Sequence, residues 1–319
     1  MSIAAVKSGR PRRADRKLDS LDVTVLAGGP GAERRVSIQS GQAVEAALRR
    51  LGHRVELLDI GPDELSALDR PADVVFIALH GEFGEDGTVQ AILEDRGIPY
   101  TGSRGPSSRL AMDKLAAKRR FEERGIPTPK YEFVDHRSIA GLESRFPVPA
   151  VVKPISSGSS VDTTIARTAG RLREAAADLV NRYGAALVEQ YIRGPELTVG
   201  ILGDEALPVC EIRTEREFYD YQAKYVDDAT QYLFDLELPG EVLERVRRLA
   251  LAAHQSLGCR VFSRVDCMLD GTTLAPYFLE VNTIPGFTSH SLVPKAAARR
   301  GISFDQLCQR ILELSLSDS

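Results

Sequence analysis

Two periodicities of apolar residues alternate along the first hundred residues. Short apolar runs predict buried strands, and stretches with an apolar residue every three or four positions predict amphipathic helices. Strands that alternate with helices imply a parallel sheet, with ligands bound at the loops that follow the strands. The predicted strands are residues 23–29, 55–60 and 73–81, and the predicted helices are residues 40–52 and 88–97.

A second unit is predicted after a helical stretch at residues 106–125, because Pro127 and Pro129 follow this stretch and interrupt regular structure. The residues PAVVKP then predict a strand that runs into the loop ISSGSSVD. A helix near residues 170–183 and a strand at residues 186–192 complete the unit.

The last third of the chain begins with residues 211–235, which are dense in charged residues and tyrosines and show no regular period. Such a segment favours a long functional loop over a core element. A helix at residues 239–258, two neighbouring strands and a closing helix from Ser303 are predicted to follow.

These two neighbouring strands carry polar side chains where an apolar face is expected. Arg264 and Asp266 alternate with apolar residues in SRVDCML, and Glu280 and Asn282 do so in FLEVN. Because an Asp-Gly turn lies between the strands, we predict an antiparallel pair that gathers all four side chains on one surface. Two close carboxylates repel each other unless a cation lies between them, and an all-oxygen ligand set suits Mg²⁺. The pattern therefore predicts a metal site.

Length, charge and cysteine spacing limit the number of domains and the kinds of partner that we expect for this chain. A length of 319 residues predicts two or three domains, and a net charge of −4 gives no general attraction to nucleic acid or to an anionic membrane. Residues 1–20 are basic but lack the apolar run of a signal peptide, and no segment is apolar enough to span a membrane, so we expect a disordered tail on a cytoplasmic protein. The four cysteines lack CxxC spacing, which predicts reduced core thiols.

Two loops are candidates for nucleotide binding. Glycines follow the first strand, as in dinucleotide-binding folds, and Asp59 would fit the ribose contact, but Arg34 stands where that fingerprint needs a third glycine. The other candidate is Lys153 with the loop SSGSS, since a lysine beside a loop rich in backbone N–H and hydroxyl groups can hold a triphosphate.

A phosphate-binding lysine and loop in one unit, joined to a magnesium-like ligand set in the next, resemble the ATP-grasp ligases. The chain is similar, over residues 21–316, to the D-alanine–D-alanine ligase family within them. This resemblance implies an α/β fold of ATP-grasp architecture, in which an N-terminal parallel-sheet α/β domain is followed by two α+β domains that clamp ATP. The motifs that carry it are, in order, AERRVSIQSG, ALHGEFGEDGTVQAIL, PYTGS, MDKLAAK, VVKPISSGSSV, VEQYIRGPELTV, FYDYQAKYVDDATQY, SRVDCML and LEVNTIPGFTSHSLVP.

The resemblance implies an activity and a division into domains. ATP phosphorylates the carboxylate of one D-alanine, and the amine of a second attacks the acyl phosphate to give D-alanyl-D-alanine for peptidoglycan synthesis. ATP is then the co-substrate, two Mg²⁺ or Mn²⁺ ions assist, and a homodimer is expected. The expected parts are a tail at 1–20, an N-terminal substrate domain at 21–103, a central ATP-grasp domain at 104–190, and a C-terminal catalytic domain at 191–319 with a lid at 211–235.

The resemblance also implies a role for each site residue. The metal ligands would be Asp266, Glu280 and Asn282, the phosphate-binding residues would be Lys114, Lys153 and Lys224, and the adenine would lie against a strand of Glu189, Gln190, Tyr191 and Ile192, with the ribose on Glu196. The first D-alanine would bind to Glu33, His80 and Ser159, and the carboxylate of the second would bind to Ser291 and the Leu292 N–H. The oxyanion would be stabilised by Arg264 and the Gly286 N–H, and Tyr225 of the lid would bond toward Ser159.

Two residues depart from the family pattern, and several alternatives stay open. Ser157 stands where the family usually has an acidic residue and Asp162 where it has a glycine, so nucleotide affinity is an open question. The lid sequence Ala-Lys-Tyr goes with dipeptide synthesis in the family, which predicts D-alanine over D-lactate as the second substrate. The alternatives are an ATP-grasp ligase with another second substrate, a nicotinamide-binding oxidoreductase, and a catalytically silent relative that only binds or regulates.

Overall fold

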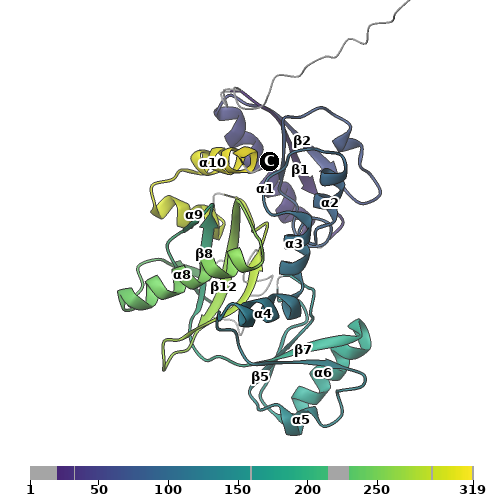
Figure 1. Cartoon of the computed structure of the whole chain (residues 1–319), viewed down its shortest axis with the longest axis vertical. Coiled ribbons are helices and arrows are strands. Elements are labelled where there is room, and N and C mark those ends of the chain that lie inside the picture. Colours follow the sequence, from purple (N-terminus) through teal and green to yellow (C-terminus); the bar gives the residue numbers. More distant parts are fainter. Residues whose placement is uncertain (1–19, 32, 159, 215–229, 289, 318–319) are drawn as a thin grey trace, which may run out of the picture.

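The computed structural model describes residues 20–31, 33–158, 160–214, 230–288 and 290–317. Three sheets follow one another along the long axis of the molecule, each with helices packed on it (Figure 1). The first sheet is parallel and the other two are antiparallel, as the predicted fold class requires. In these described ranges, no helix combines the length and the apolar character needed to cross a membrane.

The first sheet has the strand order β2-β1-β3 and is covered by helices, as the alternating pattern predicts. The helix expected to begin at residue 40 begins at Arg34, directly after the glycine turn, with Glu33 as its N-cap residue. Hydropathy missed this first turn and a half because Ser37 and Ser40 are buried polar residues. The elements are β1 (Asp22–Gly28), α1 (Arg34–Arg50), β2 (Arg54–Ile60), the short 3₁₀ helix η2 (Ser66–Leu68), β3 (Val74–Ile77) and α2 (Thr88–Asp95).

The single helix expected at residues 106–125 is in fact two helices, α3 (Gly105–Met112) and α4 (Lys114–Glu123). Asp113 separates them because its backbone is extended and its carboxylate accepts from the Ala116 N–H at 2.9 Å, which caps the second helix. Both helices contribute apolar side chains to the core of the third sheet. The predicted limits of the domains stay a prediction.

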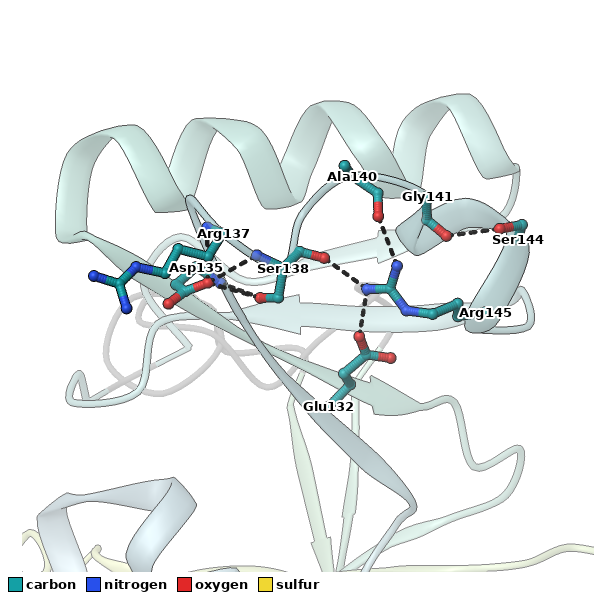
Figure 2. A network of polar contacts seen from close by, with 8 residues as sticks. All are labelled: Glu132, Asp135, Arg137, Ser138, Ala140, Gly141, Ser144 and Arg145. Atoms are coloured by element: carbon teal, nitrogen blue, oxygen red, sulfur yellow. Dashed lines mark hydrogen bonds and ion pairs between the residues drawn. The ribbon is translucent and has the colours of Figure 1, made fainter.

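The second sheet has the order β4-β7-β5-β6, with α6 on one face. Figure 2 shows the polar network that fixes the turn after its edge strand β4: Asp135 accepts from Ser138, and Arg145 donates to Glu132 and to the Ala140 carbonyl. Strand β7 ends two residues before the predicted limit. The elements are β4 (Tyr131–Asp135), α5 (Leu142–Arg145), β5 (Ala150–Lys153), β6 (Thr164–Ala166), α6 (Ala169–Tyr183) and β7 (Ala185–Gln190).

The third sheet has the order β11-β10-β8-β12-β13, and β9 pairs with the free part of β8. The last helix returns to the first sheet, so that Ile311 shares a core with Val25 and Val44 (Figure 1). All four cysteines are free and buried, as predicted. The elements are β8 (Glu196–Leu202), β9 (Glu205–Ala206), β10 (Cys210–Arg213), β11 (Gln231–Leu233), α8 (Gly240–Ser256), β12 (Phe262–Leu269), β13 (Pro276–Asn282), α9 (Leu292–Arg299) and α10 (Phe304–Ser317).

Candidate active site

A cavity of about 340 Å³ lies between the second and third sheets. Side chains from β5, β6 and β7 form one wall, and those from β8, β10, β12 and β13 form the other. Nine of the predicted site residues line it, and Ile165, Met268 and Leu279 add apolar side chains to the lining. The nine are Lys114, Lys153, Glu189, Gln190, Tyr191, Ile192, Glu196, Asp266 and Glu280. Tyr191 and Ile192 belong to the segment after β7 and not to the strand.

The polar surface of β12 and β13 has the predicted register, in which Arg264 faces Asn282 and Asp266 faces Glu280. We call these four residues the strand face. Arg264 donates to both carboxylate oxygens of Asp266, at 2.9 Å from Nε to Oδ1 and 2.7 Å from Nη2 to Oδ2. Thr198 of β8 donates to the same carboxylate at 2.6 Å, and Asn282 Nδ2 does so at 3.0 Å. The buried Asp266 charge is therefore fully compensated within the sheet.

The donor set of the strand face fits a hard divalent cation. Asp266 and Glu280 supply carboxylate oxygens on neighbouring strands, and both carboxylates are held next to positive charges, Arg264 and Lys114. Such compensation is what two neighbouring carboxylates need when no cation lies between them. Asn282 adds an amide whose oxygen and nitrogen exchange places when the group is turned over. Among the described residues there is no cluster of three or more His, Cys, Asp or Glu side chains, so a third protein ligand would have to be a residue of another type, such as Asn282.

Lys114 joins the strand face to the loop at residues 155–162, which we call the phosphate loop and of which Ser159 lies outside the described residues. Lys114 is the first residue of α4, and its N–H donates to the Ile155 carbonyl at 3.1 Å. Its Nζ donates to the Ser157 carbonyl at 2.6 Å and lies 3.1 Å from Glu280 Oε2. The break between α3 and α4 thus places this ammonium at the edge of the cavity.

Glu189, which also lines the cavity, binds two lysines. Lys153 Nζ lies 2.9 Å from Glu189 Oε2, and Lys118 Nζ lies 2.9 Å from Oε1. Burial alone raises the pKa of Glu189, but the two ammonium groups outweigh it and the pKa is lowered. Sequence reasoning missed Lys118, although it lies in MDKLAAK one helical turn after Lys114.

A second group of polar residues holds the loop at residues 283–288, next to the strand face. The buried His80 and Ser40 link this loop to the first sheet: His80 Nδ1 donates to the Ile284 carbonyl at 3.0 Å, and the Phe287 N–H donates to Ser40 Oγ at 3.1 Å. Because a carbonyl only accepts, His80 Nε2 accepts from the Ser40 hydroxyl at 3.0 Å. Burial lowers the pKa of His80, which keeps this neutral tautomer.

Glu85 is the other contact between the first sheet and this loop. It accepts from the Gly81 N–H at 2.8 Å and from the Ile284 N–H at 3.3 Å. Burial raises the pKa of Glu85 to about 8, and the nearby carboxylate of Glu33 adds to the rise. No sequence signal distinguished Glu85 or Ser40, because their role depends on contacts about two hundred residues away along the chain.

The structure places the remaining predicted residues around this second group. Glu33 lies so close to Gly81 that a Cβ there would be 2.7 Å from its Oε2, and a Cβ on Gly158 of the phosphate loop would be 3.6 Å away. Ser291 caps α9, accepts from the Thr288 N–H at 3.0 Å, and would lie 3.4 Å from a Cβ on Gly286. Leu292 is the first residue of α9 and is buried.

Three predicted site residues, Ser159, Lys224 and Tyr225, lie outside the described residues, as does the part of the predicted lid at 215–229. The described ends of that segment are β10 and β11, which pair with each other in the third sheet. The remaining predicted site residues form two adjoining groups: those that line the cavity, and those around the 283–288 loop. Arg264 connects the groups, because it donates to Asp266, which lines the cavity, and its charge also acts on His80 and Glu85.

Comparisons with known proteins agree with this arrangement. A model of the D-Ala D-Ala ligase C-terminus matches residues 121–313, and one of the N-terminus matches residues 62–103. The D-alanine–D-alanine ligase of Marinobacter nauticus is 46% identical over 298 residues, 93% of this chain and 91% of that protein.

Solved structures extend the match to the whole fold. The D-alanine–D-alanine ligase from Bacillus anthracis complexed with ATP is 34% identical, with a TM-score of 0.81 over 93% of this chain and 98% of that one. The VanG D-Ala:D-Ser ligase from Enterococcus faecalis is 28% identical, with a TM-score of 0.82 over 93% of this chain and 99% of that one. The chain therefore belongs to the D-alanine–D-alanine ligase family of ATP-grasp enzymes.

Proposed function

We propose that the cavity and the strand face together form the active site of an ATP-dependent ligase that joins two D-alanines into D-alanyl-D-alanine for peptidoglycan synthesis. Membership of the family gives the ATP-dependent ligation. One observation supports its assignment to this site: Lys114 Nζ reaches both the phosphate loop at Ser157 and the strand face at Glu280. The groups needed to hold a triphosphate and to act at its terminal phosphate therefore meet in one place.

ATP occupies the cavity in this proposal. Lys114 and Lys153 bind phosphate oxygens, and the segment from Glu189 to Ile192 lies against the adenine, with Glu196 on the ribose. The apolar side chains of the lining suit an adenine ring, and the two lysines supply positive charge for the phosphates. Lys224 of the predicted lid, which lies outside the described residues, is proposed to bind phosphate as well.

Asp266, Glu280 and Asn282 would hold one or two Mg²⁺ or Mn²⁺ ions, since an all-oxygen set with two carboxylates suits a hard cation. When bound, such ions neutralise the charge that builds on the transferring phosphoryl group. Binding requires the Asn282 amide to turn its oxygen toward the site, because Nδ2 now faces Asp266. Arg264 keeps the Asp266 carboxylate oriented throughout.

The first D-alanine is proposed to bind between Glu33, His80 and Ser159. Its ammonium pairs with the Glu33 carboxylate, and its own carboxylate attacks the terminal phosphate of ATP to give an acyl phosphate, while ADP leaves with the electrons of the broken P–O bond. The neutral His80 is fixed by Ser40 and by the Ile284 carbonyl, so it shapes this subsite without adding a charge.

The second D-alanine is proposed to bind at the start of α9, where its carboxylate meets Ser291 and the Leu292 N–H. Its amine attacks the acyl phosphate, the C–N bond forms, and phosphate leaves with the electrons of the C–O bond. Arg264 and the Gly286 N–H are the donors for the oxyanion that develops at the carbonyl. Tyr225, which lies outside the described residues, would bond toward Ser159 over the site.

The structure and the comparisons bear differently on the alternative functions. In the nicotinamide-binding alternative Asp59 contacts a ribose, whereas in the structure Asp59 is paired with Arg34. A different second substrate stays open, because one structural relative is a D-Ala:D-Ser ligase. A homodimer and a cytoplasmic location are expectations from the family resemblance.

The test is ADP release by the purified chain with ATP and Mg²⁺ in the presence of D-alanine, L-alanine or no amino acid. We expect release with D-alanine alone, and equal release under all three conditions would overturn the proposal. Product analysis with equal D-alanine, D-serine and D-lactate at neutral pH then identifies the second substrate. D-alanyl-D-alanine is the expected main product.

A further inference from the structure

A buried lysine lies behind Lys153 and does not line the cavity. Lys118, one helical turn after Lys114 on α4, has a side chain that is 0% exposed. Its Nζ lies 2.9 Å from Glu189 Oε1 and donates to Thr128 Oγ1 at 2.6 Å. Lysine is almost never fully buried unless it is paired, so this position carries a cost that its contacts must offset.

The surroundings of Lys118 hold its ammonium in one place. The Thr128 hydroxyl donates to the Phe278 carbonyl at 2.8 Å, so its oxygen is oriented to accept from Lys118. The Tyr131 ring has its centroid 5.5 Å from Nζ, within the range of a cation–π contact. Burial lowers the pKa of Lys118 to about 8, while the Glu189 carboxylate acts in the opposite direction.

The two lysines share one carboxylate, and only one of them faces the cavity. Lys153 Nζ lies 2.9 Å from Glu189 Oε2 and lines the cavity, whereas Lys118 approaches the other oxygen from the core. With Lys153 alone, Glu189 would form a neutral pair and would direct that ammonium toward itself. With both lysines the group keeps one net positive charge, and a positive potential reaches the cavity wall.

Stability alone does not account for this arrangement. Replacing a buried ion pair or triad as a whole by apolar residues of similar volume is often neutral or stabilising, so stability does not require a charged group at these positions. A fixed positive charge behind an anion-binding cavity has a use that an apolar residue cannot supply.

We propose that Lys118 is a positioning residue for ATP: it holds Glu189 and offsets its charge, which leaves the Lys153 ammonium available to the phosphates. The inference rests on the proposed function, because it takes the cavity to be the ATP site. Lys118 does not touch ATP in this account and acts only through Glu189.

The first measurement compares wild-type protein with Lys118→Met, which keeps the length of the side chain and removes the charge. We expect the KM for ATP and the Kd for ADP to rise about tenfold, with kcat and the KM for D-alanine changed by less than about twofold. A purely structural role would lower thermal stability and kcat without this selectivity. The matched control is Lys130→Met, an exposed lysine at the start of β4, for which no change is expected.

The second measurement repeats the substitution in a Glu189→Gln background. In the double variant the one charge of this group that remains is the Lys153 ammonium, which lines the cavity, and a thermal melt of both proteins checks that they fold. If Lys118 acts through Glu189, adding Lys118→Met to Glu189→Gln changes the KM for ATP by less than about twofold. A change of about fivefold or more in that background, or an unchanged KM for ATP in a folded Lys118→Met protein, would overturn the inference. Failure of the wild type to release ADP with D-alanine would instead refute the proposed function.

Discussion

The strand face and the loops beside it hold their polar groups in different ways. On the strand face, backbone pairing places Asp266 opposite Glu280, and the Asp266 carboxylate is satisfied by side chains of the same sheet. The phosphate loop and the 283–288 loop have no such ladder. Lys114 and Ser40, which come from other parts of the chain, hold these loops instead. Sheet register thus builds the strand face, and long-range contacts place the loops against it.

The comparison predicts the largest loss of activity on the strand face. Glu280→Gln removes the charge of a proposed metal ligand and keeps the shape of the side chain, so we expect kcat to fall by about 10²- to 10³-fold, or about 3–4 kcal/mol in the transition state. Measurement of ADP release at saturating ATP and D-alanine gives the value, and a thermal melt checks the fold. The matched control is Glu123→Gln, which removes an exposed carboxylate at the end of α4. A variant that keeps more than about a tenth of the wild-type kcat would contradict the metal assignment.

A loop anchor is expected to matter less. Ser40→Ala leaves His80 Nε2 and the Phe287 N–H without this partner, so we expect unfolding to become easier by about 1–3 kcal/mol and kcat to fall about tenfold. Ser37→Ala is the matched control, because Ser37 is equally buried on α1 but bonds only to the Gly28 N–H and the Ala78 carbonyl. It should lose similar stability and keep kcat within about twofold. An equal fall of kcat in both variants would mean that Ser40 does not act through the loop.

The difference between the strand face and the loops also explains which features could be predicted from the sequence. Alternation of side chains along a strand needs no distant information, so the antiparallel pair with Arg264, Asp266, Glu280 and Asn282 on one surface could be predicted from a few residues. The start of α1 was missed because its buried face carries serines, and the break at Asp113 because a capped turn keeps the helical period on both sides. Sequence alone gave no indication of Ser40, Glu85 or Lys118, because partners from other elements determine their roles.

Glu85 allows the loop contacts to be tested through pH. Its pKa is raised from 4.5 to about 8 on folding, so the unfolded chain releases this proton near pH 4.5 while the folded chain retains it. Between these values the folded state binds more protons, and the free energy of unfolding must fall as pH rises, by at most about 1.4 kcal/mol per pH unit. Glu85→Gln removes this contribution.

Urea unfolding of wild type and Glu85→Gln at several pH values between about 5 and about 8 measures the effect. We expect the stability of the wild type relative to the variant to decrease steadily across this window. A difference that stays constant with pH would show that Glu85 is already ionised at low pH in the folded protein.

The smallest effect is expected at Asp162, where the phosphate loop departs from the family pattern. Its backbone has φ of 56°, a left-handed conformation in which glycine is the usual residue. Its carboxylate accepts from Arg182 Nη2 at 2.6 Å and from the Tyr183 hydroxyl at 2.5 Å, which ties the loop to the end of α6. Hydrogen bonding to Arg182 and Tyr183 lowers the pKa of Asp162, so the tether is charged at neutral pH.

Two opposing contributions to stability make the expected effect of replacing Asp162 small. Asp162→Gly relieves the left-handed backbone but removes the tether, and an exposed ion pair contributes only about 0–1 kcal/mol. We therefore expect unchanged stability within about 1 kcal/mol, a KM for ATP raised about two- to threefold, and an unchanged kcat. Tyr183→Phe removes one hydrogen bond of the tether without altering the loop backbone. Expressed as a free energy of ATP binding, its effect on KM should be about half that of Asp162→Gly. Because added salt weakens the exposed Arg182 pair, the KM of the wild type should rise with salt toward that of Asp162→Gly. A rise of about tenfold or more in the KM for ATP of Asp162→Gly would show that the phosphate loop matters as much as the strand face, and would contradict the difference drawn between these two regions.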